Sequence, residues 1–153
     1  MKGADKNPKL LPGFQEIQYP LEYFLNTSQH LCGQTNTRDI QYPIEAVEAS
    51  IRLARMATGR PNIIAFHGGF HGRTVAAASL TTAGTKFRSG FSPIMGGVHI
   101  APFPYAFRYG WDMETAVKFA LDELDYLLAT ISSPADTAAF IIEPVLGDGG
   151  YLP

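Results

Sequence analysis

Two short apolar runs that each end in a glycine-rich turn are the feature that most constrains the fold of this 153-residue chain. The first run is NIIAF (62–66), followed by HGGFHG (67–72), and the second is TAAFIIEPV (137–145), followed by LGDGG (146–150). A short apolar run bounded by turn residues is typical of a buried strand. Helical patterns lie before, between and around these runs. Strands that alternate with helices favour an α/β fold with a mainly parallel sheet and flanking helices.

The helical patterns can be placed along the chain. IEAVEASIRLARMATG (44–59) repeats apolar residues every three or four positions, and a glycine and a proline then supply a stop. A longer pattern begins at Asp112, a favourable N-cap residue. Its predicted apolar stripe consists of Val117, Ala120, Leu121, Leu124, Leu127, Leu128 and Ile131. TVAAASL (74–80) predicts a short helix and GVHIAPF (97–103) a further strand.

The chain divides into two unlike parts. Residues 1–43 are punctuated by prolines and show weak periodicity, which predicts an irregular N-terminal segment. Residues 44–153 carry the α/β pattern, and a hydrophobic content of 46% with 17% charged residues is typical of a globular chain. The sequence stops just after a strand exit, where the crevice of an open α/β sheet lies. We therefore expect residues 44–153 to be part of a larger, truncated domain.

Charge and cysteine content argue against several classes of function. A net charge of −2 with scattered basic residues gives no electrostatic reason to expect nucleic acid or an anionic membrane as a partner. No apolar run approaches the ~20 residues that a membrane helix needs, and the first residues lack the apolar core of a signal peptide. Cys32 is the single cysteine, so no internal disulfide can form. We expect a reducing compartment, the cytoplasm or the mitochondrial matrix.

The two turns carry the candidate functional residues. Phe70 lies among glycines that let the backbone approach a ligand closely, and its flat ring would suit a planar heteroaromatic cofactor. The alternative is that Phe70 folds back into the core. Glu143 ends the apolar run of the second strand, where a carboxylate near a crevice usually needs a partner. The alternative there is a solvated acid at a strand end.

Other chemistries have less support. A metal site of His67, His71 and Glu143 would need both histidines on one helix face, and the two glycines between them disfavour a helix. A histidine bonded to the backbone is the simpler interpretation of His67. No G-x-S-x-G elbow is present, and Cys32 has no nearby acid–base signature. HGGFHG also lacks the ending of a Walker loop and the spacing of a dinucleotide fingerprint.

Three stretches together resemble class III aminotransferases, the pyridoxal-phosphate enzymes that include 4-aminobutyrate and acetylornithine aminotransferases. They are EAVEASIRLARMATGRPNIIAFHGGFHGRT (45–74), SLTTAGTKFRSGFSPIMGGVHIAPFPY (79–105) and FIIEPVLGDGGY (140–151). The resemblance implies part of the large domain of a fold-type I enzyme, which dimerises in its full-length form. It also implies an amino donor, a 2-oxo acid acceptor and pyridoxal 5′-phosphate as the cofactor.

The resemblance assigns roles to four residues. Phe70 would stack on the pyridine ring of the cofactor, and His71 and Gly72 would shape the same wall. Glu143 would lie on the substrate side of the cofactor. No catalytic residue is assigned, because the Schiff-base lysine and the aspartate that pairs with the pyridine nitrogen lie downstream in the family. Lys86 and Lys118 match non-catalytic positions.

One segment departs from the family pattern. The stretch of small residues that grips the phosphate is replaced by Gln41, Tyr42, Pro43 and Ile44. Proline has no N–H to donate, and isoleucine is bulky where small residues are expected. With the lysine also missing, we expect this chain alone to be inactive. A different class of function, a non-catalytic remnant or interaction fragment of such an enzyme, is the alternative.

Overall fold

The computed structural model describes residues 43–152. The predictions for Cys32, Gln41, Tyr42 and the irregular N-terminal segment lie outside the described residues. The predicted division of the chain at residues 43 and 44 stays a prediction. Within the described part, no helix combines the length and the apolar character that crossing a membrane would require.

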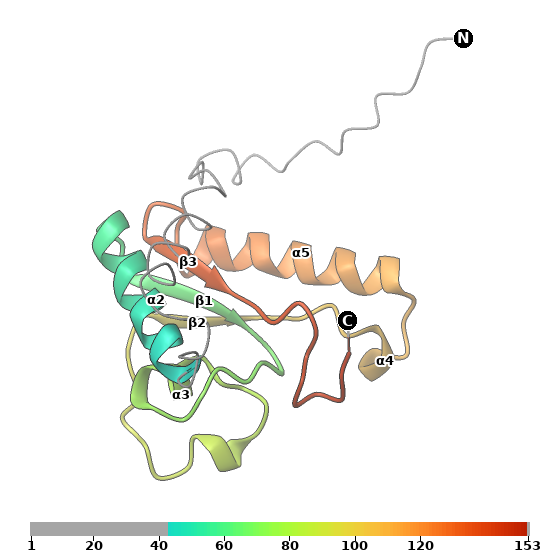
Figure 1. Ribbon diagram of the computed structural model, residues 1–153. Helices are drawn as coiled ribbons and strands as arrows, with labels where there is room; N and C mark the ends of the chain where they lie inside the picture. Colours follow the sequence, from blue (N-terminus) through green and yellow to red (C-terminus); the bar gives the residue numbers. More distant parts are fainter. Residues whose placement is uncertain (1–42, 153) are drawn as a thin grey trace, which may run out of the picture. The chain divides into compact units, whose positions relative to one another are not determined.

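Three parallel strands form a sheet, as the alternating pattern predicted. They are β1 (Asn62–Phe66), β2 (Val98–Ala101) and β3 (Thr137–Ile141), in the order β2-β1-β3. Since β1 lies in the middle, the segments that leave its carboxyl end lie next to those that leave β2 and β3 (Figure 1). The fold is therefore α/β, and the two predicted strand exits meet at one edge of the sheet.

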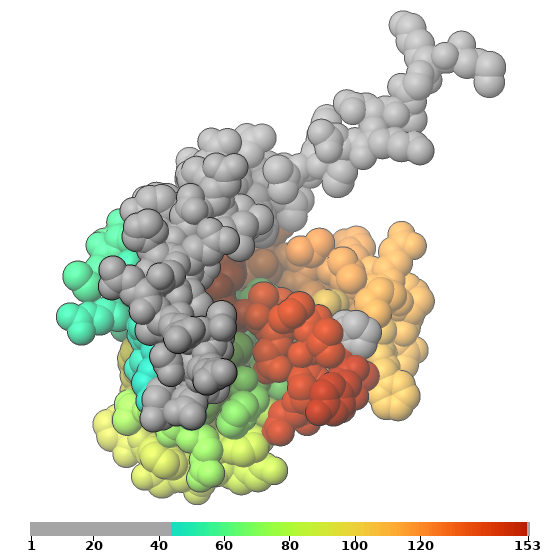
Figure 2. All heavy atoms as spheres, viewed as in Figure 1, coloured from blue at the N-terminus to red at the C-terminus, as the bar shows by residue number. Residues whose placement is uncertain are grey.

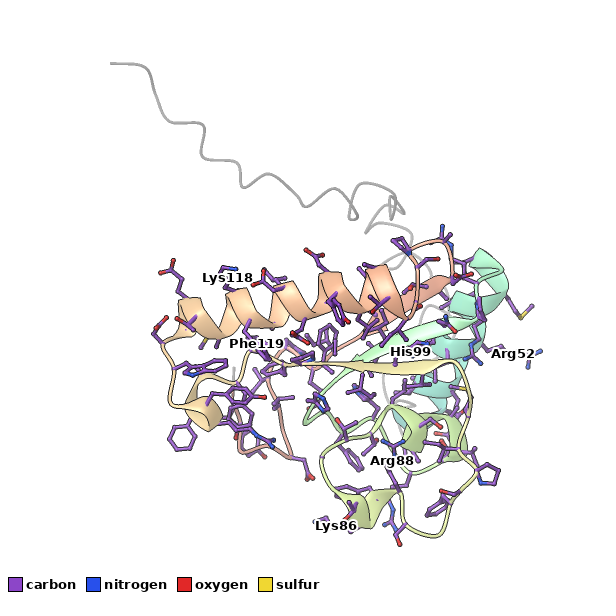
Figure 3. All side chains as sticks on the ribbon, turned by 180° about the vertical axis from the view of Figure 1, so that it is seen from behind. Arg52, Lys86, Arg88, His99, Lys118 and Phe119 are labelled. Carbon is purple, nitrogen blue, oxygen red and sulfur yellow. The ribbon has the colours of Figure 1, made fainter. Side chains whose placement is uncertain are left out.

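Helices cover both faces of this sheet. α2 (Pro43–Thr58) and the short α3 (Val75–Leu80) lie on one face, and α5 (Met113–Thr130) lies on the other (Figures 1 and 3). The remaining helical turns are a 3₁₀ turn, η2 (Thr85–Phe87), and α4 (Ala106–Tyr109), which precedes α5. All the predicted helices are present, and each lies within a residue or two of its predicted bounds.

The core between α2 and the sheet follows from side-chain periodicity. Ile51 and Ala54 of α2 pack against Ile63 and Ala65 of β1, with Leu80 at the end of α3. Ile51 and Ala54 lie three residues apart and so share a helix face, while Ile63 and Ala65 share a strand face. The predicted apolar face of this helix is therefore confirmed. This packing holds β1, and with it the start of the glycine loop, against α2.

The apolar stripe predicted for α5 is too wide. Its buried residues are Ala116, Ala120, Leu124, Leu127 and Leu128. Val117, Leu121 and Ile131 are instead exposed by 38%, 42% and 61%. The helix contacts the sheet along one line only, so apolar residues beside that line remain on the surface.

Both outer strands are shorter than predicted. β2 has four residues and β3 five, whereas the apolar patterns covered 97–103 and 137–145. β3 is also only half-buried over most of its length. The expectation that the run 137–145 forms a buried strand is therefore wrong for this strand. β3 lies at an edge of the sheet, and Ile142 and Val145 after it are exposed. Apolar composition alone does not tell where hydrogen-bonded pairing stops.

Candidate functional site

The carboxylate of Glu143 joins the two loops that leave β1 and β3. Its Oε1 accepts a hydrogen bond from the backbone N–H of Phe70 at 2.5 Å, and its Oε2 accepts one from the N–H of Gly147 at 3.0 Å. The expected partner of this carboxylate is therefore the backbone of both loops. Phe70 and Glu143 thus lie together at the ends of the neighbouring strands β1 and β3, while their roles toward a cofactor stay predictions.

Apolar packing reinforces this contact. Leu146 of the second loop is only 1% exposed, and its Cδ1 lies 3.2 Å from the position that a Cβ on Gly68 would take. Gly68 has a φ of +85°, so a side chain there would be strained as well as crowded. Leu146 also pairs with Leu152, which closes the second loop on itself. Figure 2 shows the C-terminal segment (red) packed beside the loop after β1 (green).

Two threonines hold the first loop from behind, and sequence reasoning missed them. Thr82 Oγ1 accepts from the N–H of Gly68 at 2.9 Å and donates to the carbonyl of Phe66 at 3.0 Å. Thr81 Oγ1 accepts from the N–H of His71 at 2.9 Å and faces the carbonyl of Gly72 at 3.0 Å. In the sequence, the two threonines are part of the stretch SLTT (79–82), which belongs to the resemblance to class III aminotransferases but does not by itself indicate a contact with the loop.

Phe70 takes an intermediate position. Its side chain is half-buried, and its ring makes an edge contact with Phe87, with ring centroids 4.9 Å apart and planes at 63°. Phe70 therefore does not fold back fully into the core, which was the alternative to a ligand-facing ring. The ammonium of Lys86 lies over the other aromatic ring, 4.7 Å from the centroid of Phe87.

The two histidines of the first loop differ. Burial lowers the pKa of His71 below its ordinary value, and the negative charge of Glu143 opposes this shift. His71 Nε2 is buried and has no hydrogen-bond partner among the described residues. His67 lies on the surface, where partial loss of solvation and the positive charge of Arg108 lower its pKa. The backbone N–H of His67 donates to Ala101 at 2.9 Å, so it is the main chain of His67 that is tied to the sheet.

Gly72 contacts the start of α2. A Cβ on Gly72 would lie 3.0 Å from Ala77 Cβ and 3.1 Å from Ile44 Cγ1, and the glycine has a φ of +126°. Ile44 thus packs directly against the loop, and the expectation that it crowds a phosphate site stays a prediction. Packing requires Gly72 in this structure, whatever role it has toward a ligand.

A side chain from α2 also positions the helix that follows the loop. Glu48 Oε1 accepts hydrogen bonds from the N–H groups of Ala76 and Ala77, both at 3.2 Å, and from the hydroxyl of Thr74. These N–H groups belong to the first turn of α3, where backbone donors lack helical partners. Glu48 therefore caps α3 from a neighbouring helix and fixes the end of the glycine loop.

The structure does not support the alternative of a metal site. Residues 43–152 contain no group of three histidine, cysteine or acidic side chains that could hold a metal ion, so the arrangement of His67, His71 and Glu143 as a metal site is not supported. The two lysines of this part lie elsewhere (Figure 3). Lys118 is on α5 in an exposed ion pair with Asp122, and Lys86 is in the η2 turn.

Known proteins resemble this chain over most of its length. The family described as aminotransferase class-III matches residues 43–153. The 5-aminovalerate aminotransferase of Pseudomonas putida is 38% identical over 109 residues, which are 71% of this chain and 24% of that protein. A probable 4-aminobutyrate aminotransferase of Bacillus subtilis is 31% identical over 150 residues, which are 92% of this chain and 34% of that protein.

A solved structure supports the same relationship. The taurine:2-oxoglutarate aminotransferase of Bifidobacterium kashiwanohense, in complex with pyridoxal phosphate and glutamate, matches with a TM-score of 0.66 and 25% identity. The match covers 72% of this chain and 26% of that one. The chain thus spans about a quarter to a third of the length of the curated relatives above. These similarities favour neither the metal-dependent enzyme nor the non-catalytic remnant.

Proposed function

We propose that this chain, which belongs to the class III aminotransferase family, supplies one wall of a pyridoxal-phosphate site. The protein that carries this wall would move an amino group between an amine or amino acid and a 2-oxo acid. The observation that supports the proposal best is the Glu143 carboxylate, which holds the Phe70 loop against the loop after β3. Both loops lie at the carboxyl edge of the sheet, where ligands of open α/β folds bind.

The residues at this edge fit a flat, polar-rimmed cofactor. Phe70 is half-buried, so part of its ring surface remains available for packing on an aromatic face. His71 Nε2 is buried without a partner among the described residues, and a buried ring nitrogen of this kind gains free energy from a ligand group that hydrogen-bonds to it. An aromatic ring and an orphaned polar atom on one loop suit a heteroaromatic ring with polar substituents.

Each residue of the proposed wall would have a different role toward the cofactor. Phe70 would pack on the cofactor ring, and His71, whose lowered pKa keeps it neutral near pH 7, would hydrogen-bond at the rim. Glu143 would act as a positioning residue, because both of its oxygens already accept hydrogen bonds from backbone N–H groups. Gly72 would let Ile44 and Ala77 approach the loop closely. When bound, pyridoxal phosphate supplies the electron sink for the bond changes at the amino carbon.

We also propose the setting in which the site works. The donor would be an amine or amino acid and the acceptor a 2-oxo acid, as for the aminotransferases that this chain resembles. The full-length protein would be a homodimer. A reducing compartment, the cytoplasm or the mitochondrial matrix, would suit the single cysteine, Cys32.

Binding of pyridoxine 5′-phosphate tests the proposed wall. This analogue lacks the aldehyde, so it cannot react with surface lysines. In nuclear magnetic resonance spectra of the ¹⁵N-labelled chain, we expect saturable shifts for the amides of residues 67–74 and 142–150. Phe70→Ala should weaken this binding by about tenfold, which corresponds to about 1.4 kcal/mol, because the aromatic packing is lost.

A matched variant controls for general loss of aromatic surface. Phe107 is 84% exposed and lies in α4, so Phe107→Ala should leave the dissociation constant unchanged. Shifts that do not saturate, or equal weakening by both substitutions, would show that the loops do not form a cofactor wall.

A further inference from the structure

A shallow cavity of about 510 Å³, largely open to solvent, lies at the opposite edge of the sheet from Phe70 and Glu143. Asn62 begins β1 and Gly97 directly precedes β2, so the cavity is at the amino ends of these strands. Its lining also includes Arg55 and Arg60, from the end of α2 and the turn after it. Neither the pyridoxal-phosphate wall nor its proposed chemistry uses this region.

The two arginines of this cavity have no acidic partner among the residues that the structure describes. The only ion pair within residues 43–152 joins Lys118 to Asp122. Arg55 Nη2 donates to the carbonyl of Gly96 at 2.9 Å and its Nη1 donates to Sδ of Met95 at 3.3 Å. The Nε of Arg55 is buried and lacks a partner among the described residues. Arg60 uses one nitrogen to donate to the carbonyl of Thr137 at 3.3 Å. Two guanidinium groups therefore line one cavity with donors to spare, since each carries five N–H groups.

Neither Asp136 nor the backbone at Gly97 fills the space beside the two arginines. Asp136 lies at the same edge, where its carbonyl accepts from the N–H of Asn62 at 3.0 Å. The carboxylate of Asp136, however, accepts from the hydroxyl of Ser133 at 2.6 Å. Gly97 has a φ of +71°, and a Cβ there would lie 2.9 Å from the carbonyl oxygen of Pro61 and 3.0 Å from Arg55 Nη2. Glycine at this position keeps side-chain atoms out of the space beside the guanidinium.

We propose that this cavity binds a small organic anion through a phosphate or carboxylate group, with Arg55 and Arg60 as the recognising residues. The planar guanidinium matches the geometry of both groups and forms charge-assisted hydrogen bonds with them. The volume lies within the range of about 300–1,000 Å³ that is usual for small-molecule sites. No carboxylate is among the described residues that line the cavity, and Asp136 at the same edge is not one of them.

Titration of the ¹⁵N-labelled full chain with sodium phosphate and, separately, with sodium succinate tests this site. Sodium chloride is exchanged for each salt at constant ionic strength. We expect saturable shifts for the amides of Gly59, Asn62 and Gly97, with a dissociation constant on the order of 1 mM for at least one of the two anions. The anion that binds identifies the recognised group. The cofactor analogue is distinguished from it because its shifts fall on residues 67–74 and 142–150.

Substitution of Arg60 gives the decisive comparison. Arg60→Gln should weaken binding at least about tenfold, and Arg60→Lys should weaken it less, because lysine keeps the charge but loses the planar fork. Arg52→Gln is the control, since Arg52 is exposed on α2 and does not line the cavity (Figure 3). Should Arg60→Gln disturb folding, Arg60→Lys carries the comparison alone. Unsaturable shifts, or equal affinities in the Arg60 variants and the control, would overturn the proposal.

Discussion

At the scale of single residues, Glu143 has the widest reach in the site. One carboxylate satisfies backbone donors on two loops that are far apart in the sequence, one at Phe70 and one at Gly147. Hydrogen bonds to a charged acceptor are stronger than those between neutral groups. The relative placement of the two loops therefore depends on the charge of this side chain as well as on its length.

Replacement of Glu143 by glutamine tests this dependence. Glutamine keeps one accepting oxygen, but its NH₂ group is a donor and would face the second backbone N–H without a hydrogen bond. We therefore expect the free energy of unfolding to fall by about 1–3 kcal/mol. Urea denaturation followed by circular dichroism measures the change. Glu123→Gln on the exposed face of α5 is the control and should change it little. Equal losses of unfolding free energy in the two variants would show that the bonds of Glu143 to the two loops do not stabilise the fold.

His71 should make stability depend on pH in the mildly acid range. Burial lowers its pKa in the folded state below the ordinary value of 6.5, so below that pH the unfolded chain binds more protons than the folded one. The free energy of unfolding should therefore fall as the pH drops from about 7 through 6.5 and below. Denaturation curves across this range measure the effect, and His71→Gln should flatten it. An unchanged slope in the variant would argue that His71 titrates normally.

At the scale of elements, the glycine loop is held by the segment that follows α3. Thr81 and Thr82 bind the backbone of the loop at its two ends. Glu48 caps α3, the helix that lies between the loop and these threonines in the sequence. Glycines supply the freedom to make the turn, but freedom also costs entropy when one shape must be kept. The hydroxyl groups of Thr81 and Thr82 therefore hold the glycine loop in one conformation.

Thr82→Val removes this order with little change in side-chain shape. The N–H of Gly68 would lose its partner, while the carbonyl of Phe66 would keep only the hydrogen bond from the N–H of Gly69, and the change should cost about 1–3 kcal/mol. Hydrogen exchange should show faster exchange for the amide of Gly68, whereas the amide of His71 keeps its bond to Thr81. Thr85→Val is the control, because Thr85 is exposed and starts the η2 turn outside the loop. Similar exchange rates in both variants would show that the hydroxyl of Thr82 is dispensable.

At the scale of the whole molecule, we propose that the described residues form one edge of a ligand site. The aminotransferases that this chain resembles are about three to four times longer, so the proposed wall would be one contributor to a larger active centre. The lysines in the described part are exposed, one in an ion pair on α5 and the other over an aromatic ring in η2. Neither is in the loops that Glu143 joins.

We therefore expect the 153-residue polypeptide by itself to transfer no amino groups. Incubation with pyridoxal phosphate, an amino donor and 2-oxoglutarate should yield no glutamate above background. Borohydride reduction should leave no stoichiometric adduct at a single lysine. The full-length Bacillus subtilis relative is the positive control in the same assay. Turnover by the short polypeptide, or one specifically labelled lysine, would refute this prediction.

Much of this architecture was predictable from local pattern. The spacing of Ile51 and Ala54, the run at 62–66 and the cap at Asp112 each depend on neighbours within a few residues, and each element formed where it was expected. The errors lie where burial depends on distant partners. Leu121 continues an apolar stripe but faces solvent, and Ile142 continues a strand pattern beyond the end of pairing.

The amino-acid sequence by itself determined the order of helices and strands and, through its motifs, the family to which the chain belongs. It also placed Phe70 and Glu143 at strand exits, because a strand and its turn are read from consecutive residues. Only the tertiary structure decided that Glu143 binds two backbone N–H groups, that Thr82 closes the glycine loop and that Arg55 and Arg60 share a cavity. The physical reason is that periodicity records which face of an element is apolar. It carries no information about which polar atoms from distant segments will come within hydrogen-bonding distance.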